Sequence, residues 1–356
     1  MTRTRWVGFA ALMLLGTLVV RAEGEQKFAS LGDLRLEGGG TIKDCRLGYR
    51  TFGTLNEARS NAIFFPSWFA GTSKDLADLG FVGPGKLADT SRFFVVAVDA
   101  LGNGISSSPS NSAAQRGKAF PRFTIRDMVE AEHELLAREL KLSRVYAVVG
   151  ISMGGMQAFQ WALTYPDFAE RVVAIVGSPR LVSSDLLLWG GELGAIEGAC
   201  PGDAGRLQAM KTVAAMHLMA IRTPGYLVAH TPPESLPDFL AANEKDILKS
   251  DPEDWACQVR AMMSLDIFSP HGGSPWVAAK AVRAKLMVVT SRQDLMVNPG
   301  PARAFALLAG AQTFEVTGNC GHLAFLCEEA AVSAVVGSFL GEGAGSPFTS
   351  ERKGAP

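Results

Sequence analysis

A serine flanked by glycines follows an apolar run near the middle of this chain of 356 residues. The run, 145–149, has the composition of a buried strand, and the next six residues are Gly-Ile-Ser-Met-Gly-Gly. A sharp turn from a strand into a helix leaves room only for glycines beside the serine, whose hydroxyl then protrudes from the top of a sheet. A helix-permissive stretch, 156–163, follows. The pattern predicts a nucleophile elbow that carries Ser152; in the alternative interpretation, Ser152 only caps the helix.

Short apolar segments alternate with amphipathic stretches on both sides of this motif, which is typical of a mostly parallel sheet covered by helices on both faces. We expect strands at 62–65, 93–98, 145–149, 172–176, 285–290 and 313–316, and helices at 125–140, 156–163, 301–308 and 325–340. Two antiparallel edge strands, 31–36 and 45–52, are expected before them. The sequence therefore predicts the α/β fold class.

The alternation stops between residues 181 and 282. This stretch is rich in Leu, Met, Trp and Ala and is interrupted by prolines, so we expect a helical lid insertion over the carboxyl edge of the sheet. The core is then formed by residues 23–180 and 283–340. The tail, 341–356, is rich in Gly, Ser and Pro and is expected to be disordered.

Residues 1–22 have the features of a signal peptide. Two arginines form a basic start, 6–20 are apolar apart from glycine and threonine, and Val20 and Ala22 stand where a signal peptidase requires small residues. The run is shorter than the ~20 apolar residues that span a bilayer. We expect cleavage, a secreted or periplasmic protein and no stable membrane insertion afterwards. The alternative is a protein anchored in a membrane by the uncleaved segment.

Charge and histidine spacing exclude two classes of partner. Lys and Arg nearly balance Asp and Glu, and the formal net charge is −1, so we expect no nucleic-acid partner. No histidines have the spacing of metal ligands, and we expect neither a metal nor a cofactor. The histidines that we expect to be structural or exposed are His133, His217, His230 and His271.

Five cysteines are compatible with an oxidising compartment, and their odd number leaves at least one unpaired. The two pairs to be considered first are Cys200 with Cys257 and Cys320 with Cys327. In the alternative, all five, Cys45 included, are buried small apolar residues.

A serine hydroxyl is a weak nucleophile at neutral pH, so it needs a base, and the base needs an acid that orients it. Where an elbow supplies the serine, Asp or Glu and then His follow in chain order, each on a loop after a strand. Asp294 follows the expected strand 285–290, and His322 follows 313–316. The order predicts Ser152, Asp294 and His322 as the catalytic residues. Taken singly, Asp294 could be a surface aspartate and His322 a helix cap.

Acyl transfer also needs two donors for the developing oxyanion. One expected donor is the backbone N–H of Met153, next to the serine. The other is expected in the loop 66–71 after the strand 62–65, where we favour the N–H of Phe69 and then that of Trp68.

Four segments resemble the homoserine O-acetyltransferase family of the α/β-hydrolase superfamily: 49–56 (Tyr-Arg-Thr-Phe-Gly-Thr-Leu-Asn), 83–86 (Gly-Pro-Gly-Lys), 123–128 and 150–161. The Met-Gln pair after the elbow is fairly specific to that family. The similarity covers roughly 36–179 and returns at 282–340. It implies the α/β-hydrolase fold, an acyl-Ser152 intermediate with His322 and Asp294 as its partners, and a homodimer.

Three hypotheses of function follow. The first is an exported serine hydrolase that hydrolyses a small-molecule acyl ester through acyl-Ser152. The second is an acyl-CoA-dependent O-acyltransferase, in which an alcohol or amine replaces water. The third is a non-catalytic binding protein on the same fold, against which the intact order of Ser, Asp and His argues.

Overall fold

The computed structural model describes residues 24–341. The expected signal segment, 1–22, lies outside the described residues, as does all of the expected tail except Gly341. Within the described range no single helix is long and apolar enough to cross a membrane. Two consecutive segments, Gly321–Cys327 and Glu329–Gly341, pass that test only together, and they are bent by 74°.

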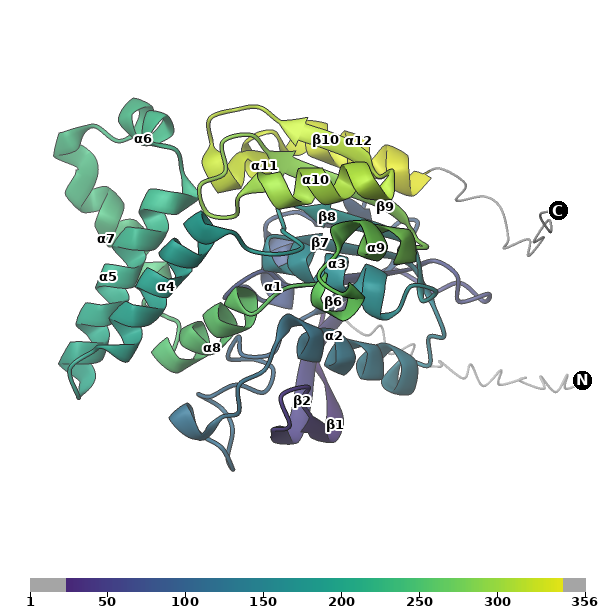
Figure 1. Ribbon diagram of the computed structural model, residues 1–356, viewed down its shortest axis with the longest axis horizontal. Helices are drawn as coiled ribbons and strands as arrows, with labels where there is room; N and C mark the ends of the chain where they lie inside the picture. The colour runs from purple at the N-terminus through teal and green to yellow at the C-terminus, as the bar shows by residue number, and fades with distance from the viewer. Residues whose placement is uncertain (1–23, 342–356) are drawn as a thin grey trace, which may run out of the picture.

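An eight-stranded sheet forms the centre of the molecule (Figure 1). Its spatial order is β1 (Lys27–Arg35), β2 (Thr41–Phe52), β6 (Phe94–Val98), β3 (Ala62–Pro66), β7 (Val145–Ile151), β8 (Ala169–Ile175), β9 (Lys285–Ser291) and β10 (Gln312–Val316). Antiparallel pairing joins β1 to β2 and β2 to β6, and every pair from β6 to β10 is parallel. The expected strands are confirmed, and the antiparallel edge pair is longer than expected.

Helices cover both faces of the sheet, which confirms the expected fold class. One face packs against α2 (Ile125–Glu134), α3 (Met153–Thr164) and α10 (Pro299–Ala309), and the other against α1 (Ser73–Asp78) and α12 (Glu329–Gly341). The two central strands, β3 and β7, carry no charged residue and are buried along their whole length, as expected where both faces of a sheet are covered. The smaller elements are β4 (Val82–Gly83), β5 (Ala88–Asp89), α11 (Ala324–Cys327) and short helical turns at Gly117–Ala119, Pro233–Ser235, Ser269–His271 and Gly321–Leu323.

Two of the expected helices differ from the prediction. The expected helix 125–140 begins with a capping box between Thr124 and Asp127, but its last part, Leu135–Glu139, is a π-helical turn. The expected closing helix 325–340 is broken at Glu328, and its side chain turns back to accept a hydrogen bond from the N–H of Gly318. Hydropathy alone does not reveal such a break, because both halves are apolar.

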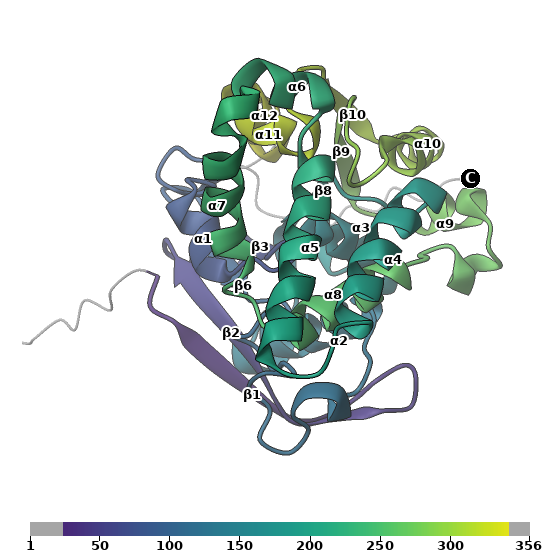
Figure 2. The same ribbon diagram turned by 90° about the vertical axis from the view of Figure 1, so that its left-hand side faces the viewer.

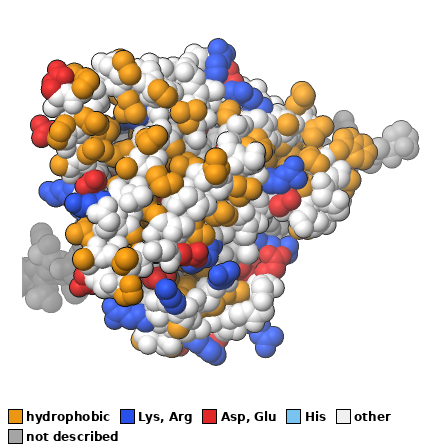
Figure 3. Space-filling model, turned by 60° about the vertical axis from the view of Figure 1, so that its left-hand side comes forward, with side chains coloured by type: hydrophobic (Ala, Val, Ile, Leu, Met, Phe, Trp, Pro, Cys, Tyr) orange, Lys and Arg blue, Asp and Glu red, His pale blue; other side chains and the backbone are white. Residues whose placement is uncertain are grey.

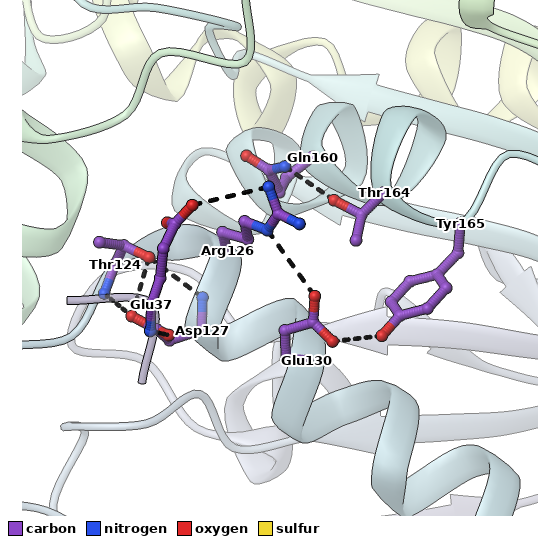
Figure 4. A network of polar contacts seen from close by, with 8 residues as sticks. All are labelled: Glu37, Thr124, Arg126, Asp127, Glu130, Gln160, Thr164 and Tyr165. Atoms are coloured by element: carbon purple, nitrogen blue, oxygen red, sulfur yellow. Dashed lines mark hydrogen bonds and ion pairs between the residues drawn. The ribbon is translucent and has the colours of Figure 1, made fainter. Parts of the chain in front are cut away.

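A polar network joins α2 to its neighbours (Figure 4). Glu130 accepts a hydrogen bond from the hydroxyl of Tyr165 and lies beside Arg126, which also faces Glu37. Gln160, on α3, donates to Thr164 Oγ1 at 2.8 Å. The bond between Tyr165 and Glu130 joins the C-terminal end of the elbow helix to α2, whereas the Gln160 bond stays within α3.

All the helices between β8 and β9 belong to one insertion, residues 183–281. They are α4 (Ser183–Glu197), α5 (Asp203–Ile221), α6 (Pro224–His230), α7 (Leu236–Ile247), α8 (Pro252–Met263) and α9 (Pro275–Ala281). Helices α4 to α7 stand together on one side of the molecule (Figures 1 and 2). Several of their apolar side chains, such as Leu187 and Val228, are exposed, and Figure 3 shows apolar side chains gathered on this side.

A buried carboxyl group in α2 makes stability depend on pH. Glu132 is 1% exposed, one carboxyl oxygen accepts from Trp161 Nε1 at 2.8 Å, and the other has no partner. Burial raises the pKa of Glu132 from 4.5 to about 8. The folded protein therefore holds a proton here that the unfolded chain releases above pH 4.5.

We therefore predict that this group's contribution to the free energy of unfolding is complete below about pH 4.5 and falls by about 1.4 kcal/mol per pH unit up to about pH 8. Glu132→Gln replaces the carboxyl group with an amide that does not titrate. In urea titrations, the free energy of unfolding of the variant should therefore rise relative to that of the native protein as pH increases from 5 to 8. Glu130→Gln, on the same helix but partly exposed, is the control. Parallel curves for the native protein and Glu132→Gln would contradict the prediction.

Candidate active site

Ser152 occupies the turn between β7 and α3. Its φ of 57° and ψ of −119° put a non-glycine residue in a sparsely populated backbone region. The Ser152 N–H donates to the carbonyl of Ile175 at 2.8 Å, and its carbonyl accepts from Met156 N–H at 2.9 Å. The helix begins at Met153, earlier than expected from the sequence, so the serine stands at its N-terminus.

The glycines of the motif are required by close backbone approach. A Cβ on Gly150 would lie 1.9 Å from the carbonyl oxygen of Gly154. A Cβ on Gly154 would lie 2.7 Å from the carbonyl oxygen of Pro66, at the end of β3. Real Cβ atoms do not approach so closely, and backbone cannot move aside as a flexible side chain does. Gly150 and Gly154 are therefore required for steric reasons, as expected from the sequence.

The structure brings the three predicted side chains together. His322 Nε2 lies 2.9 Å from Ser152 Oγ, and His322 Nδ1 lies 2.7 Å from Asp294 Oδ2. His322 and Asp294 are buried, at 3% and 6% exposed, whereas Ser152 is partly accessible. Burial strengthens these hydrogen bonds because little water competes for them. The arrangement can pass a proton from the hydroxyl to the imidazole.

Each partner is held by its own loop at the carboxyl edge of the parallel strands. Asp294 follows β9, and its Oδ1 accepts from the N–H groups of Met296 and Val297, both at 2.9 Å. His322 follows β10, and Ser291 Oγ at the end of β9 donates to the carbonyl of Gly321 at 2.7 Å. Parallel strands end at one edge, so residues that are distant in sequence meet there.

The two predicted oxyanion donors border the same place. Met153 provides the first N–H of α3, which has no acceptor within its helix. Phe69 lies in the loop after β3, and the elbow helix touches this loop through Gly154. Within residues 24–341, neither the Met153 N–H nor the Phe69 N–H donates to a protein acceptor.

One cysteine pair is a disulfide. Cys320 and Cys327 are bonded, as expected, and the loop that they close contains His322. The expected pair Cys200 with Cys257 is wrong: both are free, because Cys200 is exposed while Cys257 is buried against the carbonyls of Asp254 and Gly102. Burial also raises the pKa of the Cys45 thiol to about 12, so this thiol is no alternative nucleophile at neutral pH.

An aromatic and charged cluster from the insertion surrounds Phe69. The Phe69 ring lies edge-on to Trp189 and Trp255, with centroids 5.2 and 4.5 Å away. Glu192, fully buried, accepts from Trp255 Nε1 at 3.0 Å and lies 3.1 Å from His217 Nδ1. His217 was expected to be structural or exposed; it is in fact packed against Glu192 and Trp255. The sequence does not reveal the cluster, because its members come from three separate helices, α4, α5 and α8.

Two of the other histidines, His133 and His230, make separate contacts and do not share a site. His133 stacks on Tyr165, and His230 Nδ1 lies 2.8 Å from the carbonyl of Tyr226. No group of three or more His, Cys, Asp or Glu side chains within the described chain has the geometry to hold a metal ion.

A model of the alpha/beta hydrolase fold family matches residues 67–196. The chain is 38% identical over 165 residues to the ethyl acetate hydrolase of Pseudomonas veronii, which covers 46% of this chain and 47% of that one. It is 39% identical over 182 residues to the homoserine O-acetyltransferase of Thermobifida fusca, covering 47% and 48%. The matches thus span about half the length of these curated relatives.

Similarity of structure extends over nearly the whole chain. The solved structure of the acetyl esterase MekB superposes with a TM-score of 0.84 at 25% identity, covering 91% of this chain and 98% of that chain. The similarity therefore includes the region between 196 and 341, where the family model does not match.

We predict that the disulfide stabilises the loop of His322. Replacing both cysteines, as Cys320→Ser with Cys327→Ser, should lower the free energy of unfolding by about 2 kcal/mol, because a short loop is no longer closed in the unfolded chain. The looser histidine should slow labelling of Ser152 by a fluorophosphonate by about 3- to 30-fold. Cys200→Ser is the control. Unchanged stability and unchanged labelling, in a variant whose two substitutions are verified by mass, would contradict the prediction.

Proposed function

We propose that this homoserine O-acetyltransferase-like α/β hydrolase is an esterase that hydrolyses small acyl esters through an acyl-Ser152 intermediate. One observation carries the proposal: the unbroken hydrogen-bond chain from Ser152 through His322 to Asp294, at 2.9 and 2.7 Å. A chain of this kind activates a hydroxyl that is otherwise a weak nucleophile. A protein that only binds a ligand has no need of the strained backbone at Ser152.

The geometry supports a two-step reaction. His322 Nε2 takes the proton of Ser152 Oγ as this oxygen attacks the acyl carbon, and Asp294 stabilises the imidazolium that forms. The negative oxygen of the tetrahedral intermediate accepts from the N–H groups of Met153 and Phe69. The intermediate collapses, the bond to the alcohol oxygen breaks, and His322 gives its proton to that oxygen.

Water completes the cycle. It attacks the acyl-serine carbonyl carbon while His322 Nε2 takes one of its protons. The bond to Ser152 Oγ breaks and the proton returns to this oxygen, so that the acid is released and the serine is restored. The alternative, O-acyl transfer from acyl-CoA, uses the same acyl-enzyme, with an alcohol acceptor in place of water. It is favoured by the similarity to the Thermobifida fusca enzyme.

Acetyl esters are the proposed substrate class. Two relatives support it, the ethyl acetate hydrolase and the acetyl esterase MekB, whose names describe acetyl ester hydrolysis. The buried aromatic rings around Phe69 also favour a small acyl group, because they fill space close to the predicted oxyanion donor.

The test compares two reactions. We predict that the protein hydrolyses p-nitrophenyl acetate and does not release CoA from acetyl-CoA in the presence of homoserine. Ser152→Ala should lower kcat/KM by about 10⁴-fold or more and abolish fluorophosphonate labelling. Ser264→Ala is the control, because the hydroxyl of Ser264 donates to the carbonyl of Ala261 at the end of its own helix. Release of CoA without ester hydrolysis would establish the transferase instead, and absence of both reactions and of labelling would exclude an acyl-enzyme.

Export is the second part of the proposal. It rests on the signal-like residues 1–22 and is supported by the disulfide Cys320–Cys327, since disulfides persist mainly outside the cytoplasm. We predict that a bacterial host expressing the full chain exports a protein whose measured mass corresponds to a chain that begins at Glu23. Leu14→Lys with Leu15→Lys should block export, because charges interrupt the apolar run, whereas Leu307→Lys, at a residue 83% exposed, should not. Cytoplasmic retention of the unmutated chain would refute export.

A further inference from the structure

A buried glutamine of the insertion holds the loop that carries Phe69. Gln258 lies on α8 and is 1% exposed. Its Oε1 accepts from the N–H of Ala70 at 2.8 Å, and its Nε2 donates to the carbonyl of Leu101 at 2.9 Å. One amide side chain thus joins the insertion to two loops of the core.

Ala70 has a backbone conformation that needs such support. Its φ is 55°, in the left-handed region that residues with a Cβ rarely adopt. The carbonyl of Trp68 accepts from Gly71 N–H at 3.0 Å and closes the turn. A Cβ on Gly71 would meet the Trp68 ring at 2.3 Å, so the turn is tight. The bond to Gln258 offsets part of the cost of this conformation.

The bond also restrains the neighbouring amide. The N–H of Ala70 belongs to the peptide unit that follows Phe69, and the N–H of Phe69 belongs to the unit that precedes it. The two units share one α-carbon, so fixing the direction of the first limits the rotation that would turn the second away.

A second glutamine holds the other end of the loop. Gln157 lies on the elbow helix and is fully buried. Its Nε2 lies 3.2 Å from the carbonyl oxygen of Ser67 and 3.3 Å from that of Met153. The loop between Ser67 and Ala70 is therefore held on one side by the helix of the nucleophile and on the other by the insertion.

We propose that Gln258 is a positioning residue for acyl transfer, which holds the Phe69 N–H in the orientation that receives the oxyanion. This inference rests on the proposed acyl-Ser152 chemistry. It gives helix α8 a part in assembling the oxyanion hole. Gln258 does not touch the substrate; it acts through the Ala70 peptide.

Two variants separate positioning from packing. Gln258→Leu keeps the approximate volume but removes both hydrogen bonds. Gln258→Glu keeps the acceptor for Ala70 N–H, and its carboxyl can donate to the carbonyl of Leu101 only when it is protonated. Gln160→Leu is the matched control, because Gln160 is also buried, lies on α3 and makes its bond to Thr164 in the network of Figure 4, on the α2 side of that helix.

The experiment measures p-nitrophenyl acetate hydrolysis and inhibition by an alkylboronic acid. The boronic acid forms a tetrahedral adduct on a serine, with an oxygen in the position of the oxyanion. We expect Gln258→Leu to lower kcat by about 10- to 100-fold with KM within about threefold, less than or similar to the loss of one whole donor. The inhibition constant should rise by the same factor as kcat/KM falls. Gln160→Leu should change neither, after correction for the fraction labelled by a fluorophosphonate.

Gln258→Glu keeps the inference testable if Gln258→Leu does not fold. Its kcat relative to the unmutated enzyme should rise as pH falls and the carboxyl regains its proton. A flat ratio, a change in KM alone, or a loss equal to that of Gln160→Leu would overturn the positioning role. If the unmutated enzyme neither hydrolyses the ester nor transfers acetyl from acetyl-CoA, the proposed acyl-Ser152 chemistry is overturned, and this inference with it.

Discussion

The contact between the first turn of α3 and the end of β3 is the constraint on which the site depends. Gly154 has no side chain, so the helix can approach the carbonyl of Pro66 to a distance that a Cβ would forbid. The same approach puts the Met153 N–H beside the loop of Phe69 and lets Gln157 reach the carbonyl of Ser67. The two proposed oxyanion donors lie just after strands that are neighbours in the sheet, β7 and β3, and this contact limits how far apart they can be.

Parts of this arrangement could be predicted from the sequence because they depend on short-range chemistry. The elbow follows from a local clash that only glycine avoids. The central strands β3 and β7 follow from short apolar runs, the pattern of strands that are buried on both faces. The chain order of Ser152, Asp294 and His322 was sufficient to predict that they would meet, since each follows a strand of one parallel sheet.

Other parts could not be predicted because they depend on distant segments meeting. The proposed pairing of Cys200 with Cys257 failed because nothing in the sequence reveals that one is exposed and the other buried. The break at Glu328 arises from a side-chain bond to Gly318, ten residues away. Nothing in the sequence around Gln258 indicates that its side chain contacts Ala70, because the two residues are far apart in the chain and meet only in the folded structure.

The insertion forms hydrogen bonds with each of the three loops that follow β3, β9 and β10. Gln258 accepts from the loop after β3, and Asp185, at the start of α4, accepts from the N–H of Asn298 in the loop after β9 at 3.0 Å. Thr223, between α5 and α6, donates to the carbonyl of Asn319 in the loop after β10 at 2.5 Å. Because α4 packs against both α5 and α8, these bonds cannot shift independently. A displacement of the insertion would move the loops of Phe69, Asp294 and His322 together. The insertion is therefore part of the framework that sets the geometry of the core site.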